Sequence, residues 1–277
     1  MDIGVGLPSL VPGCDGALLV DWARRADDGP FASVAVVDRL LFDTYDPLVA
    51  LSAAAAVTRR VQLVTSILIS PLREAATLAK QVLSLDALSG GRLTLGVALG
   101  ARRDDYDASE QDWAGRGEWL DDQLATLRTA VEDRAMGPVR PALPPVLMGG
   151  AGGAALARMA RSADGWIYQG GPPRGFARAA DQARAAWADA GRPGEPRLWA
   201  MAYYALDGAE GAGRDYLLDY YAFTGHFARR IADGLLTTPT ALREFVAGYA
   251  DAGCEHLLLF PTVADGDQLG LLAEALP

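Results

Sequence analysis

The sequence predicts an α/β protein in which eight parallel strands alternate with helices and close into a barrel. Eight short apolar runs recur along the 277 residues, helix-like segments separate them, and polar or glycine-rich residues cluster directly after the runs. A strand followed by a helix must cross over to a parallel neighbour, and eight such units suggest closure into a TIM barrel. The runs span residues 3–7, 33–37, 61–66, 93–97, 145–148, 165–169, 198–206 and 256–260.

Helix ends support this alternation. Asp46 precedes Pro47, and Thr238 precedes Pro239, so each helix has a capping side chain followed by a proline whose missing amide hydrogen costs nothing there. Gly253 is placed to end the second of these helices. Apolar stripes at helical spacing follow the caps, and we expect them to pack against the sheet.

One connection is too long for the repeating pattern. Residues 207–237 separate the seventh and eighth runs, and segments of this length in compact domains are often functional. Two interpretations stay open: a lid over the binding site, or an extra helical pair that packs on the barrel flank or on a subunit partner. The rest of residues 1–277 is expected to form a single barrel domain. The insertion is rich in rings: Tyr216, Tyr220, Tyr221, Phe223, His226 and Phe227.

Composition limits the class of protein. Apolar residues make up 51%, enough for a large core, and the net charge of −10 argues against a nucleic-acid or anionic membrane partner. The amino terminus does not look like a signal peptide, and no run reaches the roughly 18–20 apolar residues that span a bilayer. The expected localisation is the cytoplasm, where Cys14 and Cys254 would be reduced thiols.

The residues after the second run carry charge. In a barrel of this kind, Asp38 and Arg39 would stand at the mouth, where active sites lie. A guanidinium stays charged and cannot act as a base, but it could stabilise an anionic ring or oxyanion. Alternatively, Asp38 neutralises Arg39 in a structural ion pair. Both interpretations stay open.

Two glycine-rich turns follow the fifth and sixth runs. Residues 149–153 read Gly-Gly-Ala-Gly-Gly, and Gly170-Gly171 comes one strand later. Bare amides at a helix N-terminus form a natural phosphate cradle, although such turns also occur simply as tight bends. Other catalytic patterns are missing: there are two histidines, no metal-ligand spacing, no nucleophile elbow and no P-loop. A barrel so poor in acids and bases is expected to borrow its chemistry from a cofactor.

Several segments resemble one family. They are Thr65-Ser66-Ile67-Leu68, the run Leu-Asp-Ala-Leu-Ser-Gly-Gly-Arg-Leu at 85–93, residues 146–150 and residues 252–254. Together they are similar to the bacterial luciferase-like superfamily, which holds monooxygenases that use reduced flavin and oxidoreductases that use deazaflavin F420. The resemblance implies a luciferase-like (β/α)8 barrel with a flavin-type ring over the strand ends. It also implies a cis peptide at Ser66–Ile67 and phosphate contacts at Gly149, Gly150 and Ala151.

The resemblance directs the choice of site residues. Many members have Asp-His where this chain has Asp38-Arg39, and some F420-dependent dehydrogenases have an acid where this chain has Ala101 after Gly100. The expected catalytic residues are Arg39, Ser66 and Asp38. The expected substrate pocket contains Tyr203, Tyr204, Tyr221 and His226, and no metal is expected. The expected cofactor-binding residues are Ser66, Ile67, Ala98, Gly149, Gly150, Ala151, Gly170 and Gly171.

Three functions follow from the resemblance. The first is a monooxygenase that uses O2 and reduced FMN, supplied by a separate flavin reductase, to oxygenate a small hydrophobic organic substrate. The second is an F420-dependent oxidoreductase that transfers hydride without O2. The third is a flavin-binding protein without catalytic activity. A homodimer is expected by resemblance.

Overall fold

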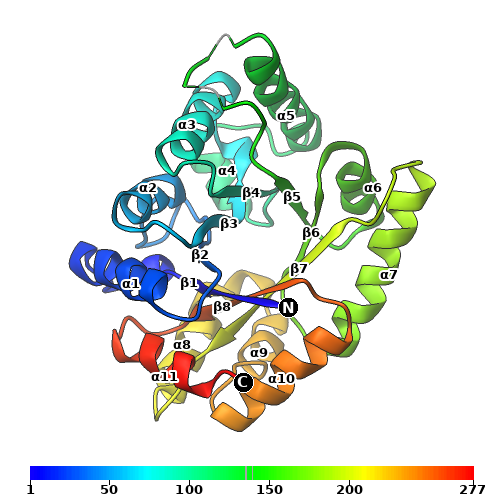
Figure 1. The fold of residues 1–277 in the computed structure, drawn as a ribbon. Helices are drawn as coiled ribbons and strands as arrows, with labels where there is room; N and C mark the ends of the chain where they lie inside the picture. Colours follow the sequence, from blue (N-terminus) through cyan, green and yellow to red (C-terminus); the bar gives the residue numbers. More distant parts are fainter. Residues whose placement is uncertain (135, 139) are drawn as a thin grey trace.

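The computed structural model describes residues 1–134, 136–138 and 140–277, and its strands form one closed parallel barrel (Figure 1). Pairing of β8 with β1, from Asp2 opposite His256 onward, closes the ring. The predicted (β/α)8 class, with an insertion between the seventh and eighth strands, is confirmed. In order around the ring the strands are β1 (Asp2–Gly6), β2 (Ser33–Val36), β3 (Gln62–Ile69), β4 (Leu93–Ala98), β5 (Val146–Gly149), β6 (Gly165–Tyr168), β7 (Arg197–Tyr204) and β8 (His256–Pro261).

Helices cover the outside of the barrel (Figure 1). The predicted caps are confirmed: Asp46 accepts from the amides of Leu48 and Val49, and Thr238 accepts from the amide of Ala241. The α-helices are α1 (Gly16–Asp28), α2 (Pro47–Val57), α3 (Ala75–Leu88), α4 (Arg103–Ala108), α5 (Arg116–Glu132), α6 (Gly153–Ser162), α7 (Pro173–Asp189), α8 (Glu210–Tyr220), α9 (Phe227–Ala232), α10 (Pro239–Asp251) and α11 (Asp267–Ala275). Short 3-10 turns are η1 (Pro8–Leu10), η2 (Ser70–Leu72) and η3 (Ala222–Thr224).

The core has two layers, because neighbouring residues of a strand point to opposite faces. The outer layer lies between strands and helices, where Val34, Leu63 and Leu257 are fully buried. The inner layer fills the barrel and continues into residues of α8. Its strand residues include Ala35, Val64, Leu147, Ile167, Trp199, Met201, Leu258 and Phe260.

Strand β3 is longer than the apolar pattern predicts. It continues past Ser66 to Ile69, through the Ser66–Ile67 peptide, which is cis as the resemblance implies. Its pairing with β4 shifts register between Thr65 and Leu68 and then resumes opposite Val97. The predicted end of the strand at Ser66 therefore marks this irregularity within the strand.

The long segment after β7 contains α8, η3 and α9 before the chain enters α10. Its far end returns to the barrel, because the Leu236 amide donates to the Tyr203 carbonyl at 3.0 Å. No helix among residues 1–134, 136–138 and 140–277 is long and apolar enough to cross a membrane. Cys14 and Cys254 are both free thiols.

His256 lies at the amino end of β8, away from the strand carboxyl ends. Its Nε2 is 2.8 Å from Ser33 Oγ, and its ring stacks on Trp199 with the centroids 4.2 Å apart. The side chain is only 3% exposed, and this burial lowers the pKa of His256 to about 4. These contacts give His256 a structural role at the amino end of the barrel.

The depressed pKa of His256 predicts a pH dependence of stability. As the pH falls, the histidine of the unfolded chain, with a pKa near 6.5, binds a proton before His256 of the folded chain does. The folded state is therefore most stable, with respect to this group, above about pH 6.5. That contribution is lost between about pH 6.5 and 4 and amounts to roughly 3 kcal/mol at full size. Urea unfolding of wild type and His256→Gln should be measured from pH 7.5 to 4. The free energy of unfolding should fall more steeply with decreasing pH in wild type than in the variant. Parallel curves would contradict the assignment.

Candidate functional site

Ser66 is the fifth of the eight residues of β3 and precedes the cis peptide. The residue is fully buried, and its Oγ has no hydrogen-bond partner within the described part of the chain. The preceding Thr65 hydroxyl, in contrast, donates to the Gly96 carbonyl at 2.7 Å. An unpaired buried polar group costs about 1–3 kcal/mol, so it calls for an explanation such as an absent ligand.

Three of the expected cofactor residues meet beside Ser66. A Cβ on Gly149 would lie 2.5 Å from Ile67 Cδ1 and 3.2 Å from Ala98 Cβ, so the end of β5 approaches β3 and β4 too closely for a side chain. Gly96 is equally constrained, because a Cβ there would lie 2.1 Å from the Thr65 carbonyl oxygen. Glycine is therefore required here by close packing around Ile67.

The turn from β5 into α6 is open at its outer side. Gly150 has a φ of +109°, and its carbonyl accepts from Trp166 Nε1 at 2.7 Å. Ala151 and Gly152 are exposed, and a Cβ on Gly152 or Gly153 would meet no atom within 4 Å. The turn thus places backbone amides at the N-terminus of α6 with open space beside them, and a bound anion needs both features.

The second glycine turn follows β6. Gly170 and Gly171 have φ values of +95° and +130°, a range that side chains rarely adopt. The Gly171 carbonyl accepts from the Tyr249 hydroxyl at 2.8 Å, which ties this turn to α10. Both glycines lie at the same end of the barrel as Gly149 and Gly150.

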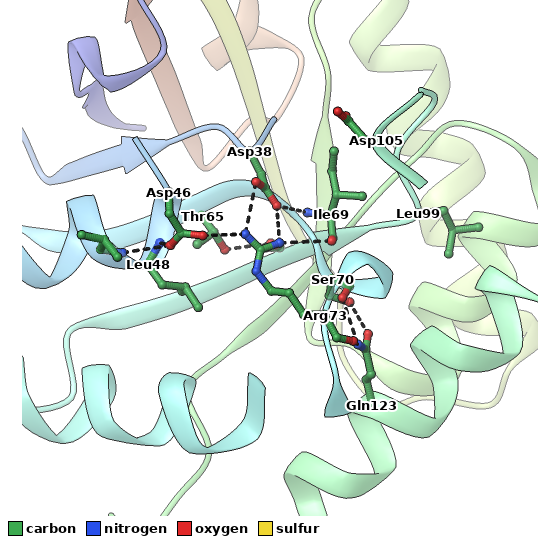
Figure 2. A network of polar contacts seen from close by, with 12 residues as sticks. Asp38, Asp46, Leu48, Thr65, Ile69, Ser70, Arg73, Leu99, Asp105 and Gln123 are labelled. Carbon is green, nitrogen blue, oxygen red and sulfur yellow. Dashed lines mark hydrogen bonds and ion pairs between the residues drawn. The ribbon is translucent and has the colours of Figure 1, made fainter. Parts of the chain in front are cut away.

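Asp38 has a different partner from the one considered in the sequence. Its carboxylate accepts from Arg73 at 2.6 and 3.3 Å and from the Ile69 amide at 2.9 Å (Figure 2). Burial raises the pKa of Asp38, and the Arg73 guanidinium opposes that shift by favouring the charged form. The acid therefore binds the exit of β3, and its two oxygens are engaged by that segment.

Arg73 extends this network to both sides of the β3 exit. Its Nη2 also donates to Asp46 at 2.9 Å, the residue that caps α2. On the other side, Gln123 of α5 donates to the Arg73 and Ser70 carbonyls at 2.7 and 2.9 Å (Figure 2). Residues 69–73 are thus held from α2 and from α5, just beyond Ser66.

Arg39 pairs with two carboxylates that the sequence reasoning missed. Its Nη2 is 2.7 Å from Asp104 and its Nε is 3.1 Å from Asp105, so the alternative of an Asp38–Arg39 pair is not the arrangement found. Asp105 is fully buried, and its second oxygen, Oδ2, has no partner in the described structure. Asp104 and Asp105 lie in the first turn of α4, the helix that follows β4, and this acidic pair was the signal in the sequence. Arg39 reaches the rim with its charge already offset.

A cluster of tyrosines covers part of the barrel mouth. The Tyr203 and Tyr221 hydroxyls are 2.7 Å apart, and Tyr216 and Tyr220 of α8 pack into the inner core layer. Burial raises the pKa of Tyr221 to about 12 and raises the pKa of Tyr203 well above its usual value, so both phenols stay protonated at neutral pH. The sequence predicts Tyr203 and Tyr221 in this pocket, and the structure adds Tyr216 and Tyr220 from the insertion.

Two expected pocket residues lie elsewhere. Tyr204 points to the outer core layer, and its hydroxyl donates to the Gln268 carbonyl at 3.4 Å. Its assignment to the pocket is wrong because adjacent strand residues face opposite sides, so Tyr203 and Tyr204 cannot both face the mouth. His226 is exposed at the start of α9, outside the tyrosine cluster.

Comparison of sequences finds a family and its relatives. The family model described as luciferase-like monooxygenase matches residues 9–244. The uncharacterized protein Rv0953c of Mycobacterium tuberculosis is 32% identical over 197 residues, which cover 64% of this chain and 68% of that protein.

Comparison of folds finds solved structures that superpose over nearly the whole chain. Monooxygenase RslO1 from Streptomyces bottropensis has a TM-score of 0.80 at 21% identity, covering 99% of this chain and 98% of that one. An F420-dependent secondary alcohol dehydrogenase in complex with an F420-acetone adduct has a TM-score of 0.78 at 14% identity, covering 99% and 98%. The oxygenating constituent of 3,6-diketocamphane monooxygenase from Pseudomonas putida, in complex with FMN, has a TM-score of 0.74 at 14% identity. That match covers 99% of this chain and 95% of the other. The TM-scores show that these proteins share the fold of this chain.

The Asp38–Arg73 network predicts a large loss of stability when it is broken. Asp38→Asn removes the charge from a buried pair and should lower the free energy of unfolding by about 3 kcal/mol. Arg103→Met is the control, because Arg103 and Asp107 are 70% exposed and 3.8 Å apart, and it should change stability by less than about 1 kcal/mol. Equilibrium urea unfolding measures both. Equal, small effects would show that the network contributes little.

Proposed function

The chain belongs to the luciferase-like monooxygenase family, and from this premise we propose that it uses reduced FMN and O2 to oxygenate a small hydrophobic organic substrate. The observation that carries the proposal is the buried, unpartnered Ser66 hydroxyl beside the close-packed Ile67, Ala98 and Gly149. A planar ring placed against this surface would give Ser66 the partner that it lacks. The residues present therefore fit a flavin-type cofactor.

Each group of residues has a role in holding the cofactor. In this proposal Ser66 hydrogen-bonds the polar edge of the ring, and Ile67 and Ala98 form the apolar wall beneath it. The amides around Gly150 and Ala151, just before α6, bind the phosphate, and Gly170 and Gly171 in the turn after β6 lie at the same end of the barrel. Bound reduced FMN supplies the electrons that activate O2 for transfer to the substrate.

The tyrosine cluster supplies the dry surroundings that such chemistry needs. Tyr203 and Tyr221 stay protonated and can donate hydrogen bonds without adding charge to the site. Excluding water protects reactive species from side reactions. The charge of Arg39 is offset by Asp104 and Asp105. Arg39 would therefore orient polar groups at the rim and would stabilise an anion less than an unpaired arginine would. The substrate, a separate flavin reductase and a homodimer belong to the same proposal.

Hydride transfer with F420 is the second candidate. It is favoured by the structural similarity to an enzyme bound to an F420-acetone adduct, and the same rim could hold a deazaflavin ring. The absence of an acid directly after Gly100 disfavours it, because some F420-dependent dehydrogenases carry their proton donor there. A flavin-binding protein without activity is the third candidate.

A titration against FMN, FAD and F420, each oxidised and reduced, separates these candidates. We expect the tightest binding for reduced FMN, followed by O2 consumption when the complex is mixed with air in the presence of the reductase system. Anaerobic turnover with reduced F420 would contradict the monooxygenase proposal. Tight flavin binding without consumption of O2 or of a hydride acceptor would favour the third candidate.

Ser66→Ala tests the residue on which the proposal rests. Removing a hydrogen bond worth about 1–1.5 kcal/mol should weaken FMN binding roughly 5- to 13-fold, measured by quenching of flavin fluorescence. Ser84→Ala is the matched control, because the Ser84 hydroxyl bonds the Lys80 carbonyl on α3, away from the rim. An unchanged dissociation constant for Ser66→Ala would remove Ser66 from the site.

A further inference from the structure

Arg102 connects the end of β4 to the insertion that follows β7. Its guanidinium carbon lies 4.5 Å from the centre of the Tyr220 ring and 4.0 Å from the centre of the Phe223 ring. Its Nη2 also donates to the Tyr220 carbonyl. We propose that Arg102 is a positioning residue that latches the carboxyl-terminal part of α8 and η3, residues 218–225, over the barrel mouth.

The residues that Arg102 holds are those that cover the mouth. Tyr220 packs edge-on against Phe42, which follows β2, with centroids 5.2 Å apart. It also packs edge-on against Tyr221 at 4.9 Å, and Tyr221 pairs with the Tyr203 hydroxyl of β7. The latched segment therefore bridges the ends of β2, β4 and β7, and Arg102 supplies the β4 link.

The electrostatics of Arg102 suit a reversible contact. Among the ion pairs of the described residues, none includes Arg102, whereas Arg39 and Arg73 each have two carboxylate partners. Its charge instead faces two aromatic rings and a carbonyl. Cation–π contacts are individually modest, so they hold a segment in place without the large cost of separating a buried ion pair.

Contacts at both ends of the insertion limit which of its residues can move. The start of α8 is fixed, because Gly213 lies so close to Thr262 that a Cβ would be 2.3 Å from its hydroxyl. Arg214 pairs with Asp233 at 2.6 Å and ties the start of α8 to the end of α9. Between these anchors, Gly225 has a φ of +61° at the junction of η3 and α9. In this proposal, residues 218–225, which lie between these anchors, are the part that moves while both ends of the insertion stay in place.

Opening of residues 218–225 would admit the cofactor and substrate, and latching would return Tyr220 and Tyr221 to exclude water. This role rests on the proposed function in one respect, that the mouth is the reaction site. The latch itself is a property of the protein without cofactor, so it can be tested separately.

Hydrogen–deuterium exchange of the cofactor-free protein tests the latch directly. Arg102→Ala should speed exchange of the amides in residues 218–225 about tenfold, with the other peptides unchanged. Arg102→Lys should give an intermediate result, because it keeps the charge but lacks the planar group that stacks on rings. Arg103→Ala, at the neighbouring exposed arginine, should match wild type. Unchanged exchange in Arg102→Ala, or an equal increase across the whole chain, would overturn the proposal.

Stopped-flow mixing with FMN links the latch to access. The association rate constant should rise severalfold in Arg102→Ala and stay at the wild-type value in Arg103→Ala. Equal rates in the two variants, with faster exchange in Arg102→Ala, would show a mobile segment that does not gate the mouth and would overturn the positioning role. Failure of wild type to bind either FMN or F420 would contradict the proposed function, and the exchange result would still decide whether Arg102 is a latch.

Discussion

Closure of the parallel ring is the constraint on which the candidate site depends. Because every strand runs in the same direction and β8 pairs with β1, the carboxyl ends of all the strands meet at one rim. Ser66, Ala98, Gly149 and Tyr203 are far apart in sequence, yet closure brings them to that rim. Strand geometry then decides which side chains face inward, and it separates Tyr203 from Tyr204.

Charge at the rim is used mainly to hold backbone in place. Asp38, Arg73 and Asp46 fix the exit of β3 against α2, and Gln123 fixes it from α5. Arg39 is held by two acids beyond β4. The arginines and acids that look catalytic in a sequence are thus largely paired with each other, whereas the buried Ser66 hydroxyl has no partner among the described residues. This pattern fits a barrel whose reactive group is a bound cofactor.

Much of this architecture was readable from the sequence, because strand and helix periodicity, helix caps and glycine turns are local signals. Asp46 and Thr238 cap helices as expected, and the cis peptide falls at Ser66–Ile67 as the family resemblance implied. Ion-pair partners were not readable, because they depend on how loops from different strands meet: Asp38 binds Arg73, and Arg39 binds Asp104 and Asp105. The inward or outward direction of Tyr204 depended on the register of β7, which the apolar run at 198–206 did not fix.

The central claim is that the rim holds a tricyclic redox ring against Ser66 and Ile67, with its phosphate at the turn before α6. A crystal structure of the protein soaked with FMN, and of a second crystal soaked with F420, tests it most directly. The account predicts ring density within hydrogen-bond distance of Ser66 Oγ and phosphate density at the amides around Gly150 and Ala151. A rim left empty by both cofactors, or a cofactor bound elsewhere on the barrel, would contradict it.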